Sequence, residues 1–345
     1  MTQPLHPRSW ALWLLAGLVL LSTTRNPIYL VLILTWISVV GGIVHWSGLA
    51  NQRSPLLSPL RFGLFVIPIT MLVNALNVPI GATVVWTLPP AIPLVGGPIT
   101  LEALVYGALN GVVLTAIYGL VVLVNQLLTV RAIVGLAPRA YHPLAVVMTI
   151  ALSFAPLTVR QIQNIREAQA VRGQRMQGLR DWLPLFLPLL LSGLERALQL
   201  AEAMTARGFA SHARQVNPRF VRMGLMLGLL AMVGGLALQL ARPSTGGAGW
   251  LIAAGLGLLL AGLWWIGRRQ PQTIYRPAPF RRQDWLVSGT ALGAVAIFLL
   301  PWLDRTSLFY YPYPRLGLPG FDPLYGLATW GLLTPAFVLL WKQLR

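Results

Sequence analysis

Two short polar cassettes stand out in this apolar chain. Residues 167–175 read EAQAVRGQR and residues 202–210 read EAMTARGFA, so both contain the pattern Glu-Ala-x-x-x-Arg-Gly. Their arginines, Arg172 and Arg207, lie 35 residues apart. A polar pattern that recurs in this way predicts two equivalent docking points for a partner with two-fold or pseudo-two-fold symmetry.

Each arginine is followed by glycine, the residue that best accepts the left-handed backbone found just after a helix. We therefore expect Arg172 and Arg207 in the last turns of two helices that face the cytoplasm, with Gly173 and Gly208 ending them. A simpler interpretation stays open, because an arginine near a helix C-terminus suits the helix dipole and glycine is an ordinary helix stop. Repetition of the whole spacing favours the docking interpretation.

The composition indicates a membrane protein. Of the 345 residues, 56% are hydrophobic and only 10% are charged, whereas soluble domains carry about 25% charged residues. Several apolar runs can cross a hydrocarbon layer about 30 Å thick as helices. We expect an all-α polytopic membrane protein with about eight transmembrane helices plus cytoplasmic amphipathic helices. The expected crossings are residues 10–24, 27–45, 61–87, 101–130, 222–240, 250–267, 285–303 and 324–341.

The basic residues set the orientation. With both termini inside, all but four of the 26 Lys and Arg residues fall on the cytoplasmic side, in agreement with the positive-inside rule. The net charge of +18 therefore does not indicate a nucleic-acid partner. Two further apolar stretches, 143–159 and 182–194, would carry arginines outside if they crossed, so we expect them to lie in or under the inner surface.

The chain is accordingly expected to have three parts. Residues 1–130 hold the first four transmembrane helices, residues 131–221 form the cytoplasmic region, and residues 222–345 hold the remaining transmembrane helices. The part of this last region beyond about residue 240 is an extension to which the sequence assigns no role.

No enzyme site can be assembled from this sequence. The absence of cysteine excludes thiolate catalysis and cysteine-ligated metals. The only lysine, Lys342, lies at the C-terminus, so a Walker A loop cannot form and any ATP hydrolysis must come from another chain. The four scattered histidines have no metal-ligand spacing. We expect a protein that is not an enzyme and that needs no cofactor or metal.

Several motifs together resemble the transmembrane T component of energy-coupling factor transporters, a family that includes cobalt-uptake permeases. HPRSWALWLL followed by TRNPIYLVL is similar to the family's opening, which has an Asn-Pro-x-Tyr turn between its first two helices. ITLEALVYGALNGVVL is similar to the start of its fourth helix, and IREAQAVRG and AEAMTARGF are similar to its paired Ala-Arg-Gly signatures. The resemblance extends over residues 5–240.

The resemblance implies a coupling scaffold in an ATP-driven transporter for a vitamin or a transition-metal ion, in a prokaryotic cell membrane. Arg172 and Arg207 would end two coupling helices and insert into acidic grooves on two ATP-binding-cassette ATPases, because guanidinium binds carboxylate through two parallel bonds. Gly173 and Gly208 would present these arginines, and Ala206 would precede the second. A small membrane S component would bind the substrate, so this chain does not identify it.

The resemblance also implies a stiff, V-shaped or crossed pair of coupling helices whose angle changes as the ATPases close. Their apolar faces would pack on the transmembrane core or on the S component; these faces include Ile162 and Ile165 on one helix and Leu194 and Leu198 on the other. The sequence departs from the family pattern at Val171, where alanine is usual, at His6, where aspartate is common, and at Trp10, where lysine is common.

Two other functions stay open at this point. A self-contained carrier or channel would need no ATPases and would tolerate the loss of both arginines. A membrane-embedded enzyme acting on lipid should show a cluster of acids or histidines at an interface. The cytoplasmic region does hold acids, Glu167, Asp181, Glu195 and Glu202, but Glu167 and Glu202 are more naturally helix-solubilising charges.

Overall fold

The contacts divide the chain into two compact units. Unit 1 comprises Met1–Thr129 together with Arg276–Arg345, and unit 2 is Val130–Tyr275. The expected three-part division follows the order of the chain, whereas these contacts place the C-terminal segment with the N-terminal one. The computed structural model describes residues 5–49, 57–87, 97–138, 141–173, 183–209, 218–241, 247–269, 279–300 and 303–343.

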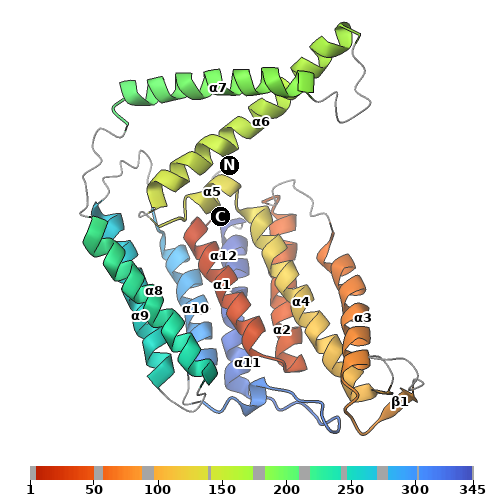
Figure 1. The fold of residues 1–345 in the computed structure, drawn as a ribbon. Coiled ribbons are helices and arrows are strands. Elements are labelled where there is room, and N and C mark those ends of the chain that lie inside the picture. Colours follow the sequence, from red (N-terminus) through yellow and green to blue (C-terminus); the bar gives the residue numbers. More distant parts are fainter. Residues whose placement is uncertain are drawn as a thin grey trace. The chain divides into compact units, whose positions relative to one another are not determined.

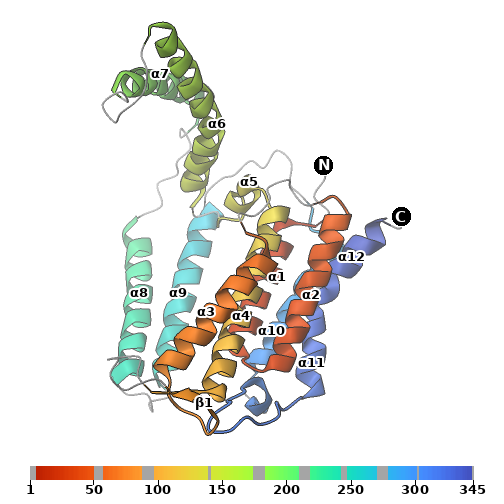
Figure 2. The same ribbon diagram turned by 90° about the vertical axis from the view of Figure 1, so that its right-hand side faces the viewer.

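Unit 1 is a bundle of helices with one small β-hairpin (Figures 1 and 2). Its N-terminal elements are α1 (Pro7–Thr23), α2 (Pro27–Trp46), α3 (Pro59–Asn77), β1 (Val84–Thr87), β2 (Pro98–Thr100) and α4 (Leu101–Leu127). Its C-terminal elements are α10 (Arg282–Leu299), η3 (Thr306–Leu308), α11 (Pro323–Thr329), η4 (Trp330–Leu333) and α12 (Thr334–Gln343). α10 packs on α1, and α11 and α12 pack on α2, so the two chain segments share one core.

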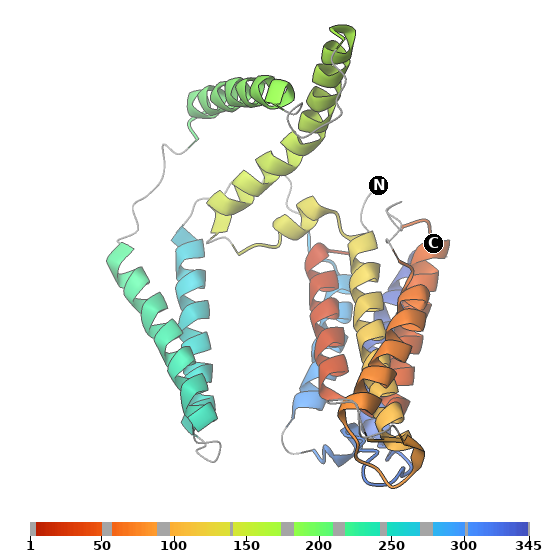
Figure 3. The same ribbon diagram turned by 45° about the vertical axis from the view of Figure 1, so that its right-hand side comes forward.

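Unit 2 contains two helix pairs. Its elements are α5 (Val130–Val134), α6 (His142–Val171), α7 (Leu183–Ala206), α8 (Pro218–Ala241) and α9 (Gly247–Arg269). α6 contacts α7, and α8 packs along α9 (Figure 3). A Cβ on Gly255 would lie 2.7 Å from the Gly228 carbonyl oxygen, so small residues set the close approach of α8 and α9, as is common between membrane helices.

The all-α membrane fold is confirmed. A helix occupies each expected crossing, and seven helices among the described residues are long and apolar enough to cross a membrane. The third crossing was predicted to reach residue 87, which is wrong. α3 ends at Asn77 and β1 follows, because Pro79 disfavours the helical conformation at the residue before it.

The second half of α6 is polar, yet the helix is long and apolar enough to be a candidate membrane span. Its segment Pro143–Val171 is among the seven candidate spans. The expectation that residues 143–159 lie in or under the inner surface therefore stays a prediction.

One end of unit 1 is held together by the Asn-Pro-x-Tyr turn. The buried Asn26 side chain accepts a hydrogen bond from the Ile28 N–H (2.9 Å) and thereby caps α2. Its amide nitrogen donates to the carbonyls of Ser307 (2.7 Å) and Gly320 (2.6 Å). The Tyr29 hydroxyl accepts from the Asp322 N–H at 2.7 Å. The turn therefore anchors the loop that precedes α11.

The opposite end of unit 1, where α1 begins and α12 ends (Figure 1), is held by one buried carboxylate. Asp284 Oδ1 accepts from the His6 N–H (2.6 Å) and the Ser9 hydroxyl (3.2 Å), and Oδ2 accepts from the Arg281 N–H (2.8 Å). His6 Nδ1 accepts from the Arg8 N–H at 3.1 Å and caps α1. An acid from α10 therefore serves the start of α1.

The last spanning segment is interrupted by the 3-10 turn η4. Pro335 has no N–H to offer the Gly331 carbonyl, and this carbonyl accepts instead from the Thr334 hydroxyl at 2.9 Å. The break therefore follows from the sequence Gly-Leu-Leu-Thr-Pro.

Two tryptophans of the N-terminal helices hold this interruption in place. The buried indole of Trp13 on α1 donates to the Leu332 carbonyl (2.9 Å), and the indole of Trp36 on α2 donates to the Thr329 hydroxyl (3.1 Å). Backbone groups inside a bilayer have no water to bind, so these two donors stabilise the broken segment.

Replacing Asn26 by alanine should destabilise unit 1. The carbonyls of Ser307 and Gly320 would lose a donor and α2 would lose its cap, which together correspond to about 1–3 kcal/mol of unfolding free energy. The measurement is thermal unfolding in detergent, followed by tryptophan fluorescence. Asn77→Ala is the matched control, because that exposed amide bonds only the Val73 carbonyl of its own helix. Equal shifts in the two variants would contradict this role of Asn26.

Acidification should loosen the start of α1. Burial lowers the pKa of His6, Arg8 lowers it further, and Asp284 partly opposes them. The folded state therefore favours neutral His6. The stabilisation that this preference gives the folded state is present above the ordinary pKa of 6.5 and is lost as pH falls. When the pH falls from about 7 to 5.5, the melting temperature of the wild type should decrease more than that of His6→Asn. The asparagine side chain still accepts a hydrogen bond, but it does not titrate. Parallel curves for the two proteins would refute this.

Candidate functional site

The arginine and glycine of the first signature lie directly after α6. Arg172 follows the last helical residue, Val171, with φ −80° and ψ 7°. Gly173 has φ +81°, and its N–H donates to the Ala170 carbonyl at 3.0 Å. A Cβ at Gly173 would meet no atom within 4 Å, so the backbone conformation, and not crowding, requires glycine there.

The second signature repeats this geometry after α7, whose last residue is Ala206. Gly208 has φ +73°, and its N–H donates to the Thr205 carbonyl at 2.9 Å. The Phe209 N–H donates to the Met204 carbonyl, also at 2.9 Å. These two bonds form the Schellman motif that ends many helices. Both predicted glycine stops therefore have the expected left-handed backbone.

Both signature arginines are exposed to solvent. Among the residues that the structure describes, no hydrogen bond or ion pair engages the guanidinium of Arg172 or Arg207. Each cation stands at the end of a helix, one residue before a glycine with a left-handed backbone. This arrangement leaves both guanidinium groups available to carboxylates of another molecule.

The apolar faces of the two helices differ in exposure. Ile162 and Ile165 of α6 are half-buried, whereas Leu194 and Leu198 of α7 are 60% and 57% exposed. The exposed stripe on α7 is longer than the sequence prediction and also includes Phe186, Leu187, Leu190 and Leu191. The sequence does indicate this longer stripe, because apolar residues spaced three and four apart continue back to the start of α7.

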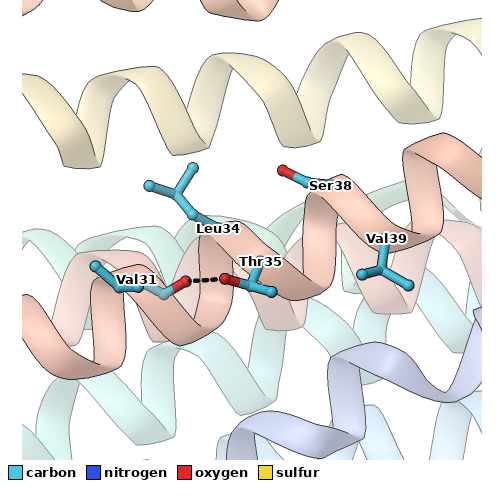
Figure 4. A pocket seen from close by; sticks show the side chains of 5 residues that line it. All are labelled: Val31, Leu34, Thr35, Ser38 and Val39. Carbon is cyan, nitrogen blue, oxygen red and sulfur yellow. Dashed lines mark hydrogen bonds between the residues drawn. The ribbon is translucent and has the colours of Figure 1, made fainter.

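Other hollows and clusters in the described residues carry no comparable chemistry. A shallow cavity of about 520 Å³ lies along α2 and is lined by Val31, Leu34, Thr35, Ser38 and Val39 (Figure 4). Its Thr35 hydroxyl donates to the Val31 carbonyl of the same helix at 2.8 Å. Within the described ranges no three His, Cys, Asp or Glu side chains form a group that could hold a metal ion.

Comparison with known families decides where this chain belongs. The model of the cobalt transport protein family, CbiQ, matches residues 2–218. The chain belongs to the CbiQ family. The matched region holds α1 to α7 and both signatures, and α8 begins at its last residue. The C-terminal helices of this CbiQ-family protein lie outside the matched region, although α10 to α12 share a core with α1 and α2.

Similar curated proteins carry the name energy-coupling factor transporter transmembrane protein. The protein of Leuconostoc gelidum subsp. gasicomitatum is 28% identical over 152 residues, which cover 38% of this chain and 57% of the relative. That of Bacillus selenitireducens is 28% identical over 231 residues, which cover 60% of this chain and 79% of the relative. That of Macrococcus caseolyticus is 36% identical over 84 residues, which cover 23% of this chain and 32% of the relative. The chain thus spans little more than half of the first relative.

Substitution of Gly173 by alanine should disturb the first signature without any steric clash. A left-handed backbone costs an L-residue about 1–2 kcal/mol, so the turn after α6 should open and the orientation of Arg172 should become less defined. Amide hydrogen exchange at residues 170–173 should accelerate in the variant. Gly193→Ala is the control, since that glycine lies inside α7 and a Cβ added there would meet no atom within 4 Å. Unchanged exchange in Gly173→Ala would show that the turn does not require glycine.

Proposed function

We propose that this chain is the transmembrane coupling scaffold of an ATP-driven micronutrient uptake transporter. Membership of the CbiQ family and the shared name of the relatives support a place in an energy-coupling factor complex. The observation that carries the proposal is the pair of similar helix ends, each presenting an exposed arginine before a left-handed glycine. The transported substrate would be a vitamin or a transition-metal ion.

Arg172 and Arg207 would be the contacts to two ATP-binding-cassette ATPase subunits. Both guanidinium groups are exposed, and each would bind a carboxylate in a groove of one ATPase through two parallel hydrogen bonds. Gly173 and Gly208 would hold the turns, and Ala206 would allow close approach of the second helix end. Two docking points of the same shape suit a partner that is itself two-fold or pseudo-two-fold.

The exposed apolar face of α7 would contact a small membrane S component that binds the substrate. Leu194 and Leu198 are more than half exposed, and an apolar face of this length lies favourably against lipid or against another membrane protein. Movement of the ATPases would tilt α7 and thereby reorient the S component. Specificity for the substrate would therefore reside on that partner and not on this chain.

The scaffold would have no enzymatic activity of its own, since ATP hydrolysis would occur on the ATPase subunits. It would lie in a prokaryotic plasma membrane with both termini in the cytoplasm. The asymmetry of basic residues supports this orientation, because the loop regions expected inside hold nearly all arginines.

Loss of either signature arginine should weaken assembly with the ATPases. Arg172→Ala and Arg207→Ala each remove a charge-assisted contact of about 1.5–3 kcal/mol, so ATPase retention on the tagged chain should fall about tenfold or more per variant. The double variant should lose both ATPases. The measurement is quantitative co-purification from native membranes in mild detergent.

Arg166→Ala is the matched control, because Arg166 is also exposed on α6 but does not end the helix. Full retention of the ATPases by the double variant would overturn the assignment of these arginines. Purification of the chain alone and monodisperse from native membranes, with no ATPase and no S component, would instead favour a self-contained carrier or channel.

A further inference from the structure

α6 and α7 are joined by a hydrogen bond at equivalent places. Arg196 Nη2 donates to Gln161 Oε1 at 2.9 Å. Gln161 lies eleven residues before Arg172, and Arg196 lies eleven residues before Arg207. The bond therefore connects the two helices at the same distance from their signatures, and Figure 1 shows the two helices lying across each other.

The burial pattern of the two helices repeats with the same offset. From this bond onward the half-buried residues are Gln161, Ile162, Ile165 and Gln169 on α6, and Arg196, Leu200 and Met204 on α7; Ile162 alone lacks a half-buried counterpart, because Ala197 is exposed. A spacing of four residues follows one face of a helix. The three residues on α7 are Gln161, Ile165 and Gln169 displaced by the 35 residues that separate the signatures, so the equivalent faces of the two helices are the half-buried ones.

The segments between the bond and the signatures are built to be stiff. Residues 161–171 and 196–206 contain neither proline nor glycine, whereas Pro156, Pro188 and Gly193 all lie before the bond. At a rise of about 1.5 Å per residue, each segment carries its arginine about 16 Å from the bond. Two helical arms of equal length thus extend from one contact.

We propose that Gln161 and Arg196 are positioning residues that form the pivot of the coupling pair and fix the separation of Arg172 and Arg207. This inference rests on the proposed function, because the arms matter only if both arginines dock at once. A two-point attachment gains affinity only when its spacing matches the partner. A charge-assisted bond between a planar guanidinium and an amide oxygen holds the two helices together at this point, so its loss would let that spacing vary.

The spacing can be measured directly, because the full chain has no cysteine. Spin labels on Ala168→Cys and Ala203→Cys, which are exposed and each four residues before a signature arginine, would report the separation of the arms by electron double resonance in detergent. Gln161→Leu or Arg196→Leu should broaden or shift the distance distribution. The exchanged pair, Gln161→Arg with Arg196→Gln, should restore it, because donor and acceptor are both present again.

Gln163→Leu is the matched control, as Gln163 is exposed on the same helix, and it should leave the distribution unchanged. If a leucine variant aggregates, Gln161→Glu serves in its place and should narrow the distribution, because it forms an ion pair with Arg196. Wild-type distributions in both leucine variants, or an exchanged pair that behaves like the single variants, would overturn the pivot.

Retention of the ATPases separates this inference from the proposed function. Each leucine variant should bind the ATPase pair roughly tenfold more weakly, and the exchanged pair should recover wild-type binding. Weaker binding in Arg172→Ala and Arg207→Ala but not in the pivot variants would refute the pivot alone. Undiminished binding in the two signature variants would refute the proposed function, whatever the spin labels report.

Discussion

The Asn26 amide donates to a carbonyl 294 residues further along the chain, and the rest of unit 1 depends on hydrogen bonds of this kind between its N-terminal and C-terminal segments. Inside a bilayer a backbone carbonyl without a donor has no water to replace it. Asn26 donates to carbonyls of the loop before α11, and Trp13 donates to a carbonyl of the interrupted last span. Asp284 accepts from the His6 N–H and the Ser9 hydroxyl at the start of α1. The polar atoms of one chain end are thus satisfied by the other.

This dependence explains why the bundle extends past the region that the CbiQ family model matches. α10 to α12 lie beyond residue 218 but cover the buried faces of α1 and α2. Leu332 and Tyr325 are fully buried among residues of the N-terminal helices. The C-terminal segment is therefore part of the core of unit 1 and not an appendage.

Unit 2 has the opposite character around its signatures. Both arginines, the left-handed glycines and most of the apolar stripe of α7 are exposed, and a hydrogen bond between Gln161 and Arg196 joins α6 to α7. Segments with little buried surface are those that move most readily. The region around the signatures therefore buries much less of its surface than the helices of unit 1 do.

The sequence alone determined the features that depend on neighbouring residues. Hydropathy located the spans, and the glycine after each signature arginine predicted the left-handed turns. The end of α3 was missed by ten residues, because the apolar run that continues beyond Pro79 outweighed the effect of that proline. Only the tertiary structure decided that Asp284 serves the start of α1 and that Trp13 holds the last span, through partners 278 and 319 residues away. Polar side chains at such separations carry no periodic pattern, so their pairing follows from packing in three dimensions and cannot be found by spacing along the chain.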